Sequence, residues 1–442
     1  MGAGVDQVVT EQLLPEATDV VIIGGGIIGV STALTLAERG ISVVLFEKGK
    51  IAGEQSSRNW GWCRQQGRDP RELPLIVESL RLWKDMNRRV ESETGFQQCG
   101  IASLSSNAAD LALHEEWLGI ARIHGIDSRL VLQKELDKLL PGRAAQYAGA
   151  LYTPSDGRAE PAQAVPAMAQ AAQRCGASLL QNTAVRGIET QAGSVSGVVT
   201  EKGRINCDVV VLAGGVWSRL FCTPLGIDLP QLKVVSSVLR TRPLPGGPEV
   251  SVSGRGFTFR KRLDGGYSIA HGEVIHFDLV PDSFRLLSCF LPLAWMAKRE
   301  LRFRISNRFV KEWREPKTWS LDEVSPFEKV RVLDPAPLPQ VLDSALRNLK
   351  TAYPFFQGLE VAEKWAGMID VTPDAVPIIS NVAHLPGLFL ATGFSGHGFG
   401  IGPAAGQLAA DLVLGTPTDL DPTPFALSRF RGGSKIRLLA GI

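Results

Sequence analysis

The feature that most constrains this chain is a glycine-rich turn between a short apolar strand and an amphipathic helix near its start. Residues 19–23 read Asp-Val-Val-Ile-Ile, which is typical of a strand buried in a parallel sheet. Gly24, Gly26 and Gly29 follow directly, in the spacing Gly-x-Gly-x-x-Gly. Apolar residues at positions 30, 33, 34 and 37 then predict one face of a helix, and a second apolar strand follows at 42–46. This order predicts a strand–turn–helix–strand unit that binds a dinucleotide.

Each residue of the turn has a physical role in that binding. Gly24 permits the tight turn, Gly26 lets the backbone approach a pyrophosphate, and Gly29 lets helix and strand pack closely. The helix N-terminus offers partial positive charge and free N–H groups to phosphate. Glu47 ends the second strand, 18 residues after Gly29, where a carboxylate binds ribose and repels a 2′-phosphate. FAD or NAD is therefore favoured over NADP; the alternative is an ordinary glycine turn. We also expect cofactor contacts from Ile28, Lys48 and Val185.

Composition excludes several other classes of protein. The 442 residues include 47 basic and 45 acidic side chains, so the formal charge is only +2 and no nucleic-acid partner is expected. Six scattered cysteines form no Cys-x-x-Cys pair, so we expect reduced thiols in a cytoplasmic protein and no metal site. Residues 1–17 lack the basic start and apolar run of a signal peptide.

Three further segments carry small residues in the patterns of a known family. The first is Ser56-Ser57-Arg58-Asn59-Trp60-Gly61, and the second is an apolar strand that begins at Asp208 and closes on Gly214 and Gly215. The third joins residues 365–377 to a strand at 388–391 and a glycine-rich loop. Together these segments resemble the FAD-dependent amine oxidoreductases related to D-amino-acid oxidase, D-amino-acid dehydrogenase, glycine oxidase and sarcosine oxidase. The resemblance runs from about residue 19 into the 410s, with a divergent middle.

The resemblance implies that FAD is the cofactor and that all three segments contact it. The loop at 56–61 would run along the pyrophosphate and the flavin ring, and the glycine-rich loop would bring a second helix N-terminus to the flavin. Reduction puts negative charge near the flavin N1 and C2 oxygen, which N–H donors and a positive helix end stabilise. In the later segments the implied contacts are Ala213, Gly214, Trp217, Gly393, Phe394, Gly396, His397, Gly398 and Phe399.

The expected fold is α/β, α+β overall, with a Rossmann-like FAD-binding domain and an inserted substrate domain that has a mainly antiparallel sheet. Helical patterns near 108–124 and 133–140, and strand-like runs near 233–241 and 256–262, belong to the insert. We expect the FAD-binding domain to comprise residues 17–100, 151–231 and 361–442. The substrate domain would then comprise residues 101–150 and 232–360.

The resemblance implies oxidation of a C–N bond, in which an amine gives a hydride to flavin N5 and the imine is hydrolysed. D-amino acids are favoured, whereas N-methyl amines, cyclic imino acids and a flavin-bearing subunit of a larger complex stay open. In sarcosine-oxidase-like members a lysine after the Gly-His-Gly-Phe element assists oxygen, and Gly400 stands there in this chain. This difference favours a dehydrogenase that passes electrons to a quinone or carrier, although other oxidases lack that lysine too.

An amino-acid substrate needs a cation for its carboxylate, and arginine can form two parallel hydrogen bonds with it. In several amino-acid-specific relatives an arginine follows the Trp-x-Gly element, but residues 368–370 read Met-Ile-Asp here. Arg58 and Arg64 flank Trp60-Gly61-Trp62 beside the presumed flavin loop, and both are candidates. Arg58 could instead bind pyrophosphate or face solvent.

Three other polar side chains are candidates for the substrate site. Tyr267 and His271 share one face of a predicted strand, although a single histidine on a strand is more often structural. His397 lies in the glycine-rich loop, where it either bonds backbone near the flavin or acts on the substrate.

Residues 284–313 form an unusual segment. Residues 286–297 are apolar but too few to span a bilayer alone. Apolar residues at 301, 305, 309 and 313, with basic residues on an adjacent face, then predict a basic amphipathic helix. Such a helix lies on an anionic membrane surface, or packs on the substrate domain or a partner subunit. The first alternative would place the chain on the inner surface of the membrane and suits a quinone-linked dehydrogenase.

Overall fold

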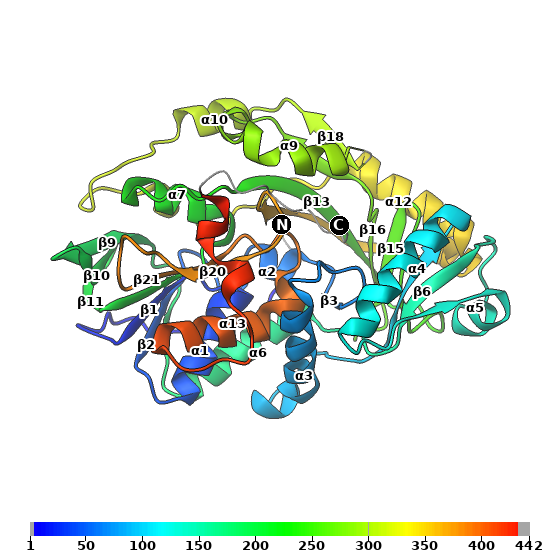
Figure 1. Ribbon diagram of the computed structural model, residues 1–442, viewed down its shortest axis with the longest axis horizontal. Helices are drawn as coiled ribbons and strands as arrows, with labels where there is room; N and C mark the ends of the chain where they lie inside the picture. The colour runs from blue at the N-terminus through cyan, green and yellow to red at the C-terminus, as the bar shows by residue number, and fades with distance from the viewer. Residues whose placement is uncertain (1–3, 299, 432–442) are drawn as a thin grey trace.

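A six-stranded, mostly parallel sheet forms one half of the computed structural model, which describes residues 4–298 and 300–431 (Figure 1). The strand order is β20-β21-β12-β1-β2-β8, and β1 pairs in parallel with both β2 and β12. The strands are β1 Val20–Ile23, β2 Val43–Phe46, β8 Ser178–Leu180, β12 Val209–Leu212, β20 Ile378–Asn381 and β21 Leu388–Thr392. The predicted strand–turn–helix–strand unit and the Rossmann-like sheet are confirmed.

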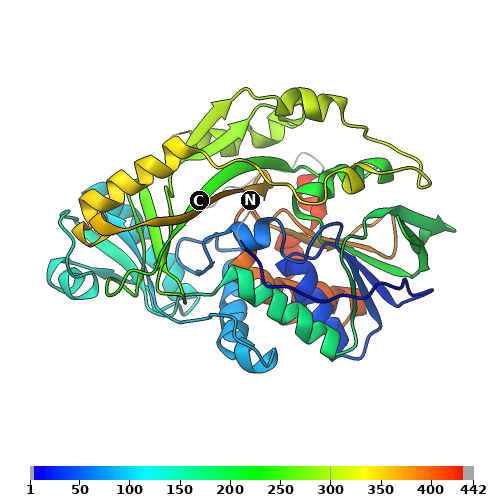
Figure 2. The same cartoon turned by 180° about the vertical axis from the view of Figure 1, so that it is seen from behind.

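Four helices pack together beside this sheet. The first, α1 (Ile27–Glu38), lies between α13 (Gly398–Leu414) and α6 (Pro161–Arg174), and α3 (Leu73–Arg89) packs on α13 (Figures 1 and 2). Helices α1 and α13 are so close that a Cβ atom on Gly406 would lie 2.7 Å from the backbone nitrogen of Thr32. The two ends of the chain therefore meet through a backbone-to-backbone helix contact.

A small antiparallel sheet covers the opposite face of the six-stranded sheet. It comprises β9 Val185–Gln191, β10 Ser194–Thr200 and β11 Gly203–Asn206. Ile188 and Val198 share one apolar core with Val21 and Phe46 of the larger sheet. The six-stranded sheet is consequently buried on both faces, which explains its continuous apolar strands.

A ten-stranded sheet forms the other half of the molecule. Its order is β18-β17-β13-β16-β15-β14-β4-β6-β5, with β19 paired to β13. The pairing is mainly antiparallel, as expected, although β14–β4 and β17–β18 are parallel. The strands are β4 Ile101–Ser105, β5 Arg129–Val131, β6 Gly149–Thr153, β13 Leu232–Thr241, β14 Ser251–Gly254, β15 Phe257–Lys261, β16 Tyr267–Ala270, β17 Ile275–Asp278, β18 Leu301–Arg304 and β19 Val361–Val371.

The helices of this half match the sequence patterns. The predicted helices near 108–124 and 133–140 are α4 (Ala108–Ile123) and α5 (Gln133–Leu139), and α12 (Pro339–Ala352) packs on β15 and β16. Two strands differ from the expected segments. Strand β6 crosses residue 151, and β19, which begins at residue 361, pairs with β13 over ten positions rather than joining the six-stranded sheet.

The segment 281–314, here called the arm, projects from the edge of the ten-stranded sheet (Figure 1). It comprises α8 (Pro281–Arg285), α9 (Leu287–Met296), β18 and α10 (Arg308–Arg314). The predicted single helix through residues 301–313 is wrong, because residues 301–304 form a strand that pairs with the open edge of β17. Residue 299, inside the predicted segment 284–313, lies outside the described residues.

Residues 315–338, here called the strap, return from the arm across the six-stranded half (Figure 1). The strap contains α11 (Pro326–Lys329). Two ion pairs hold it to the small sheet and its flanks, Arg186 with Glu328 and Glu201 with Arg331. The strap therefore joins the arm to the nucleotide-binding half.

Candidate active site

A cavity lies where the N-terminal ends of α1 and α13 converge. It collects residues from segments far apart in the sequence, as predicted for the cofactor site. The predicted residues that line it are Gly24, Gly26, Ile28, Glu47, Lys48, Ser56, Asn59, Val185, Ala213, Gly214, Trp217, Phe394, Gly396, Gly398 and Phe399.

The glycines of the first turn are required by close packing. Gly24 has φ +115°, and a Cβ atom there would collide with the carbonyl oxygen of Ala213. A Cβ atom on Gly29 would collide with the carbonyl oxygen of Gly24. Gly26 differs because it lines the cavity, and the absence of a Cβ atom leaves room there. An added Cβ would lie 3.0 Å from Ser56 Oγ. The close contacts explain why this turn needs glycine at positions 24 and 29, while the approach of a pyrophosphate to Gly26 stays a prediction.

Glu47 and Lys48 shape the next part of the cavity. The Glu47 carboxylate accepts backbone N–H bonds from Gly25 at 2.8 Å and Gly49 at 2.7 Å, and burial raises the pKa of this carboxyl. Lys48 Nζ lies 2.6 Å from Glu54 Oε1 and 4.4 Å from the centre of the Trp217 ring. Glu47 thus orders the turn backbone and keeps lone pairs for a ribose hydroxyl.

Seven of the predicted cofactor residues do not line this cavity. Gly29, Gly61 and Gly393 lie where a Cβ atom would collide with neighbouring atoms, so their role is in close packing. Ser57 borders a separate polar cavity. Trp60 and His397 face the neighbouring cavity described below. Arg58, on α2 (Gln55–Arg58), is buried and donates to Asp334 Oδ1 at 2.6 Å and to the Ala366 carbonyl at 2.8 Å. Its guanidinium therefore ties the strap to β19.

Further lining residues come from the strap and from β19. Phe327 reaches the cavity from α11 of the strap. Met368 and Asp370 come from β19, and Asp370 accepts the backbone N–H of Gly393 at 2.7 Å. Burial raises the pKa of the Asp370 carboxyl. No local signal marks Phe327, because only the path of the strap brings it to the cavity.

A second cavity adjoins the first, and Gln55, Asn59, Gly396 and Phe399 border both. Its walls are largely aromatic and aliphatic, with several cationic or imidazole side chains among them. The residues that characterise it are Trp60, Trp62, Arg64, Arg68, Val238, His271, Val341, Ile369 and His397. This mixture suits a small molecule that has both charged and apolar parts.

Two arginines give the second cavity its positive charge. Arg68 is 4% exposed, its Nε donates to the Arg64 carbonyl at 3.1 Å, and its Nη1 has no hydrogen-bond partner among the described residues. The Arg64 guanidinium lies 5.8 Å from the centre of the Trp62 ring. Burial lowers the pKa of both arginines, that of Arg68 to about 9. Arg64 was predicted, whereas Arg68, four residues later, was missed.

Two buried carboxylates stand behind these cations. Glu72 is fully buried at the start of α3, and His397 Nδ1 lies 2.9 Å from its Oε2. Asp156 accepts the backbone N–H of Gln65 at 2.7 Å, and burial raises the pKa of Asp156 to about 7. Glu72, and Asp156 in its ionised form, offset part of the charge of Arg64 and Arg68.

Of the two predicted residues near β16, only His271 reaches the cavity. Its Nδ1 is buried with no hydrogen-bond partner among the described residues, and burial, then Arg302, lowers its pKa. Tyr267 is instead fully buried in the core of the ten-stranded sheet. Its hydroxyl donates to the Gly246 carbonyl at 3.1 Å, so the structure does not bring it to the cavity.

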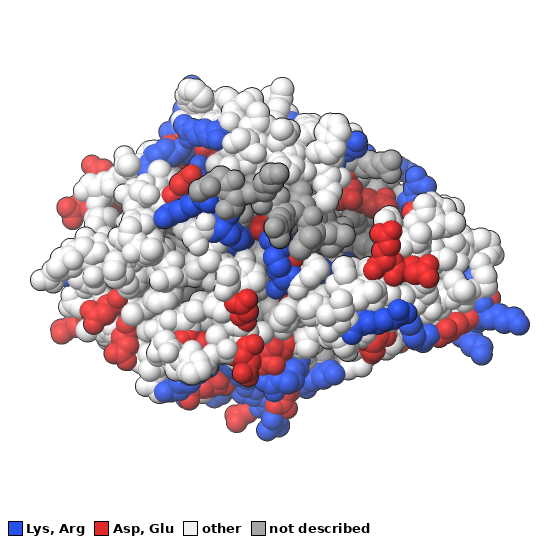
Figure 3. Space-filling view, viewed as in Figure 1, with Lys and Arg blue, Asp and Glu red and all other residues white. Residues whose placement is uncertain are grey.

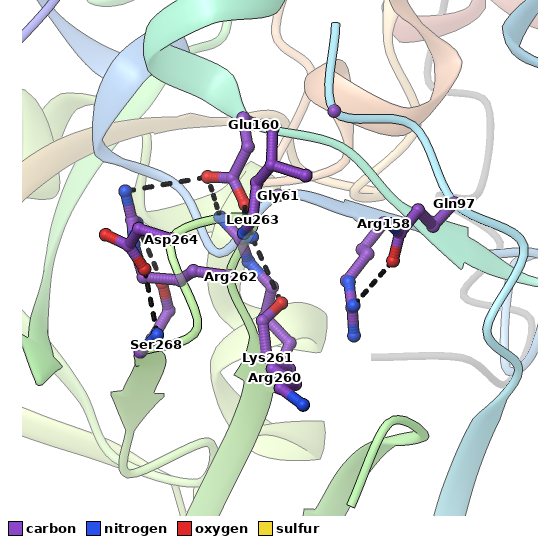
Figure 4. A network of polar contacts seen from close by, with 12 residues as sticks. Gly61, Gln97, Arg158, Glu160, Arg260, Lys261, Arg262, Leu263, Asp264 and Ser268 are labelled. Atoms are coloured by element: carbon purple, nitrogen blue, oxygen red, sulfur yellow. Dashed lines mark hydrogen bonds and ion pairs between the residues drawn. The ribbon is translucent and has the colours of Figure 1, made fainter. Parts of the chain in front are cut away.

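A buried polar network fixes the cavity wall at Trp60 (Figure 4). Arg260 of β15 is 1% exposed, pairs with Glu160 and donates from Nε to the Trp60 carbonyl at 2.6 Å. Glu160 also accepts the backbone N–H of Leu263 at 2.9 Å. Burial raises the pKa of the Glu160 carboxyl, but the charge of Arg260 outweighs this effect, so the pKa is lowered. The network ties the ten-stranded sheet to the loop beside the cofactor cavity.

The profile of the family described as "FAD dependent oxidoreductase" (DAO) matches residues 19–412. The chain belongs to this family. The match covers both sheets and both cavities, and the predicted resemblance is confirmed. The family is FAD-dependent, and its members include glycine and sarcosine oxidases.

The chain is similar to a deaminase of amino acids and to oxidases of amines and amino acids. An L-amino acid deaminase from Proteus myxofaciens, solved with anthranilate, has 37% identity and a TM-score of 0.94, with 97% of each chain covered. Glycine oxidase of Pseudomonas aeruginosa is 27% identical over 92% of this chain and 98% of its own. 4-Methylaminobutanoate oxidase of Paenarthrobacter nicotinovorans is 25% identical over 95% of this chain, which spans 46% of that protein.

The first cavity fits FAD on its own chemistry. Two helix N-termini supply amide donors for a pyrophosphate and for a reduced flavin, and the Gly26 position lets a phosphate approach the backbone. Among the described residues, no three His, Cys, Asp or Glu side chains group as metal ligands. No helix in the described part of this oxidoreductase is long and apolar enough to cross a bilayer.

Proposed function

We propose that this chain oxidises the C–N bond of an amino acid with a large apolar side chain. One observation carries the proposal: Arg68 Nη1, Trp62 Nε1 and His271 Nδ1 are buried without hydrogen-bond partners in the part of the chain that the structure describes. All three residues line the cavity beside the cofactor site. Buried polar groups without partners cost free energy, so a polar ligand that bonds them is favoured. FAD bound in the first cavity would supply the hydride acceptor.

The second cavity would orient the substrate at both ends. Arg64 and Arg68 would hold the carboxylate, and Trp60, Ile369 and Val341 would surround the apolar side chain. Anthranilate, bound by the similar Proteus deaminase, carries a carboxylate on an aromatic ring, which supports this division. We further propose that the six-stranded half binds FAD and the ten-stranded half contributes the substrate walls.

The stereochemistry of the substrate is open to direct test. The sequence patterns favoured a D-amino acid, whereas the 37% identity to an L-amino acid deaminase supports the L-enantiomer. We propose the L-enantiomer, with D-amino acids, N-methyl amines and cyclic imino acids as the competing substrates.

Anaerobic reduction of the bound flavin tests this function. L- and D-amino acids, N-methyl amines and proline are added without oxygen, and bleaching of the flavin absorbance is followed. We expect L-amino acids with large apolar side chains to bleach it. Arg68→Met should raise the amino-acid concentration that half-saturates flavin reduction at least 10-fold, because one charged hydrogen bond contributes ~1.5–3 kcal/mol. The concentration dependence for amines without a carboxylate should not change. Arg81→Met on α3, an exposed control, should change neither. Bleaching by no amine would refute the function and favour a flavin-bearing subunit.

We also propose that the arm contacts an anionic membrane surface, where a quinone would accept the electrons. The arm carries eight Lys or Arg and three Asp or Glu residues. Leu286, Phe290 and Leu293 anchor it in a small core, while Trp295 and Trp313 are 71% and 69% exposed. In Figure 3 the upper part of the molecule is mostly uncharged, with Lys and Arg side chains flanking it. Exposed tryptophans beside cations suit the membrane interface.

Vesicle binding tests the arm. The holoenzyme should sediment with vesicles containing phosphatidylglycerol and release in high salt, and Trp295→Glu with Trp313→Glu should abolish binding. Leu113→Glu, at an exposed position of α4, is the matched control and should bind normally. Unchanged binding by the double variant would refute the proposal. It would also be refuted if the wild-type protein bound no vesicles but formed a dimer that the double variant did not form.

A further inference from the structure

The amine of an amino acid is mostly protonated near pH 7, whereas hydride loss from its Cα requires the neutral amine with a free lone pair. A group in the second cavity that accepts this proton would therefore speed the reaction. The candidate must line the cavity, be neutral before the substrate binds, and be stabilised once it becomes a cation.

His397 satisfies the geometric requirement. It lines the second cavity at the start of α13, one residue after Gly396, which borders both cavities. Its Nδ1 lies 2.9 Å and 3.2 Å from the two carboxylate oxygens of Glu72. Its other ring nitrogen, Nε2, forms no hydrogen bond with any described residue. A carboxylate accepts only, so Nδ1 carries the hydrogen and Nε2 of the neutral ring is an acceptor.

Glu72 is built into the fold in a way that fixes this arrangement. It is fully buried and precedes the first turn of α3, where its carbonyl accepts the N–H of Ile76 at 3.0 Å. Ser79 and Trp83 on the same helix each donate to the carbonyl oxygen of Gly400, at 2.7 and 2.9 Å. These bonds hold the start of α13 against α3, so the distance between His397 and Glu72 is set by two rigid helices.

We propose that His397 is the base for the substrate amine and that Glu72 is its positioning residue, an inference that rests on the proposed function. An N–H bond of the substrate ammonium breaks, and an N–H bond forms at His397 Nε2. The neutral amine remains beside the flavin site, and the ring becomes a cation. The buried Glu72 carboxylate stabilises that cation and keeps Nδ1 from accepting the proton.

The surrounding charges agree with a neutral ring before the substrate binds. Burial and then Arg68 lower the pKa of His397, while Glu72 raises it and Arg64 lowers it further. Two further cations near this site, Arg71 and Arg429, each form an ion pair with Asp374. The substrate carboxylate would neutralise Arg64 and Arg68, so substrate binding itself strengthens His397 as a base.

The first test measures the titration of His397 without turnover. The chain has six histidines, so selective carbon-13 labelling of the imidazole gives few NMR signals, and His397→Asn identifies the relevant one. In the holoenzyme, Glu72→Gln should move the His397 midpoint to lower pH by about 1–3 pH units, because an opposite charge is lost. Glu78→Gln on α3, which removes an outward-facing carboxylate paired with Arg81, should leave it unchanged. An unmoved midpoint in Glu72→Gln would overturn the proposal.

The second test measures anaerobic flavin reduction across pH. His397→Asn should slow reduction about 10²–10⁴-fold at pH 7 and approach the wild-type rate near pH 10, where the substrate supplies neutral amine itself. An equal loss at every pH would assign His397 a structural role only and overturn the proposal. If His397→Asn loses FAD, the isosteric Glu72→Gln is measured in its place. It should slow flavin reduction at pH 7 by a smaller factor and again approach the wild-type rate near pH 10. If no amine reduces the flavin of the wild type, both the proposed function and this inference are refuted. If amines reduce it but the variants have the same pH profile as the wild type, only this inference is refuted.

Discussion

The contact between α1 and α13 makes a quantitative prediction for Gly406→Ala. The added Cβ would lie 2.7 Å from backbone atoms of both Ser31 and Thr32 and closer still to Ser31 Cβ, whereas non-bonded atoms need about 3.5 Å. The helices must therefore separate by about 1 Å. Overpacking of this kind costs up to ~3 kcal/mol. Alanine recovers ~1 kcal/mol of helix propensity, which leaves a net loss of ~2 kcal/mol.

Gly119→Ala is the matched control, because Gly119 lies inside α4 with nothing within 4 Å of its would-be Cβ. It should raise the free energy of unfolding by ~1 kcal/mol. At ~2 cal/mol/K per residue, 1 kcal/mol corresponds to about 1 °C in Tm for a chain of this length. Tryptophan fluorescence on heating should therefore show Tm lowered by about 2 °C in Gly406→Ala and raised by about 1 °C in Gly119→Ala.

The same variant tests whether helix packing supports the cofactor site. Separation of α1 and α13 moves two helix N-termini at the cavity, so the Kd for FAD should rise about 10-fold if 1.4 kcal/mol of the strain is relieved in the FAD-free protein. Quenching of flavin fluorescence measures this Kd. Identical Tm and Kd values for Gly406→Ala and Gly119→Ala would refute the close helix contact.

Three further predictions follow from buried groups. Gly26→Val should abolish FAD uptake, measured as the flavin-to-protein absorbance ratio, because its side chain would fill the cradle beside Ser56; a normal ratio would contradict the site. Arg260→Met should lower the free energy of unfolding in urea by ~3 kcal/mol, the low end of the range for a broken buried pair, because buried Glu160 keeps only Arg262, at 3.5 Å, as a cationic partner; adding Glu160→Gln should recover part of the loss. The pKa of Asp156 is raised from 3.8 to about 7, so the folded state holds this proton more tightly than the unfolded state and stability falls as pH rises from about 4 to 7. Asp156→Asn should flatten that part of the curve of unfolding free energy against pH, and an unchanged slope would contradict the raised pKa.

The nucleotide-binding unit could be predicted from sequence because its signals are local. A buried strand, three glycines at fixed spacing and an amphipathic helix follow one another within twenty residues. Each glycine has a steric cause at its own position, such as the contact between Gly29 and the Gly24 carbonyl. The glycine-rich loop before α13 was recognisable for the same reason.

The substrate side was harder to predict because it depends on tertiary contacts. Alternation predicted that Tyr267 and His271 share one face of a strand. Strand β16 ends at Ala270, however, and only His271 meets the cavity, whereas Tyr267 lies in an apolar core. Arg68 and Glu72 follow Arg64 at intervals of four residues, which was the available signal. Only the packing of α3 on α13 reveals that Glu72 meets His397.

The arm shows how a free sheet edge overrides a helical pattern. Apolar residues at intervals of four from Leu301 predicted a helix, yet residues 301–304 pair with β17 instead. Backbone hydrogen bonds to an exposed edge outweigh weak helix propensity in so short a run. The segment still has exposed apolar side chains and basic residues, although part of it is a strand and not a helix.

Hydrogen exchange with and without FAD tests most directly whether the two ends of the chain form one cofactor site. The amides of residues 24–29 and those of residues 393–402 should both gain protection when FAD is added to the FAD-free protein, and to a similar extent. Protection of residues 24–29 alone, with no change at 393–402, would contradict a single cavity shared by the N-termini of α1 and α13.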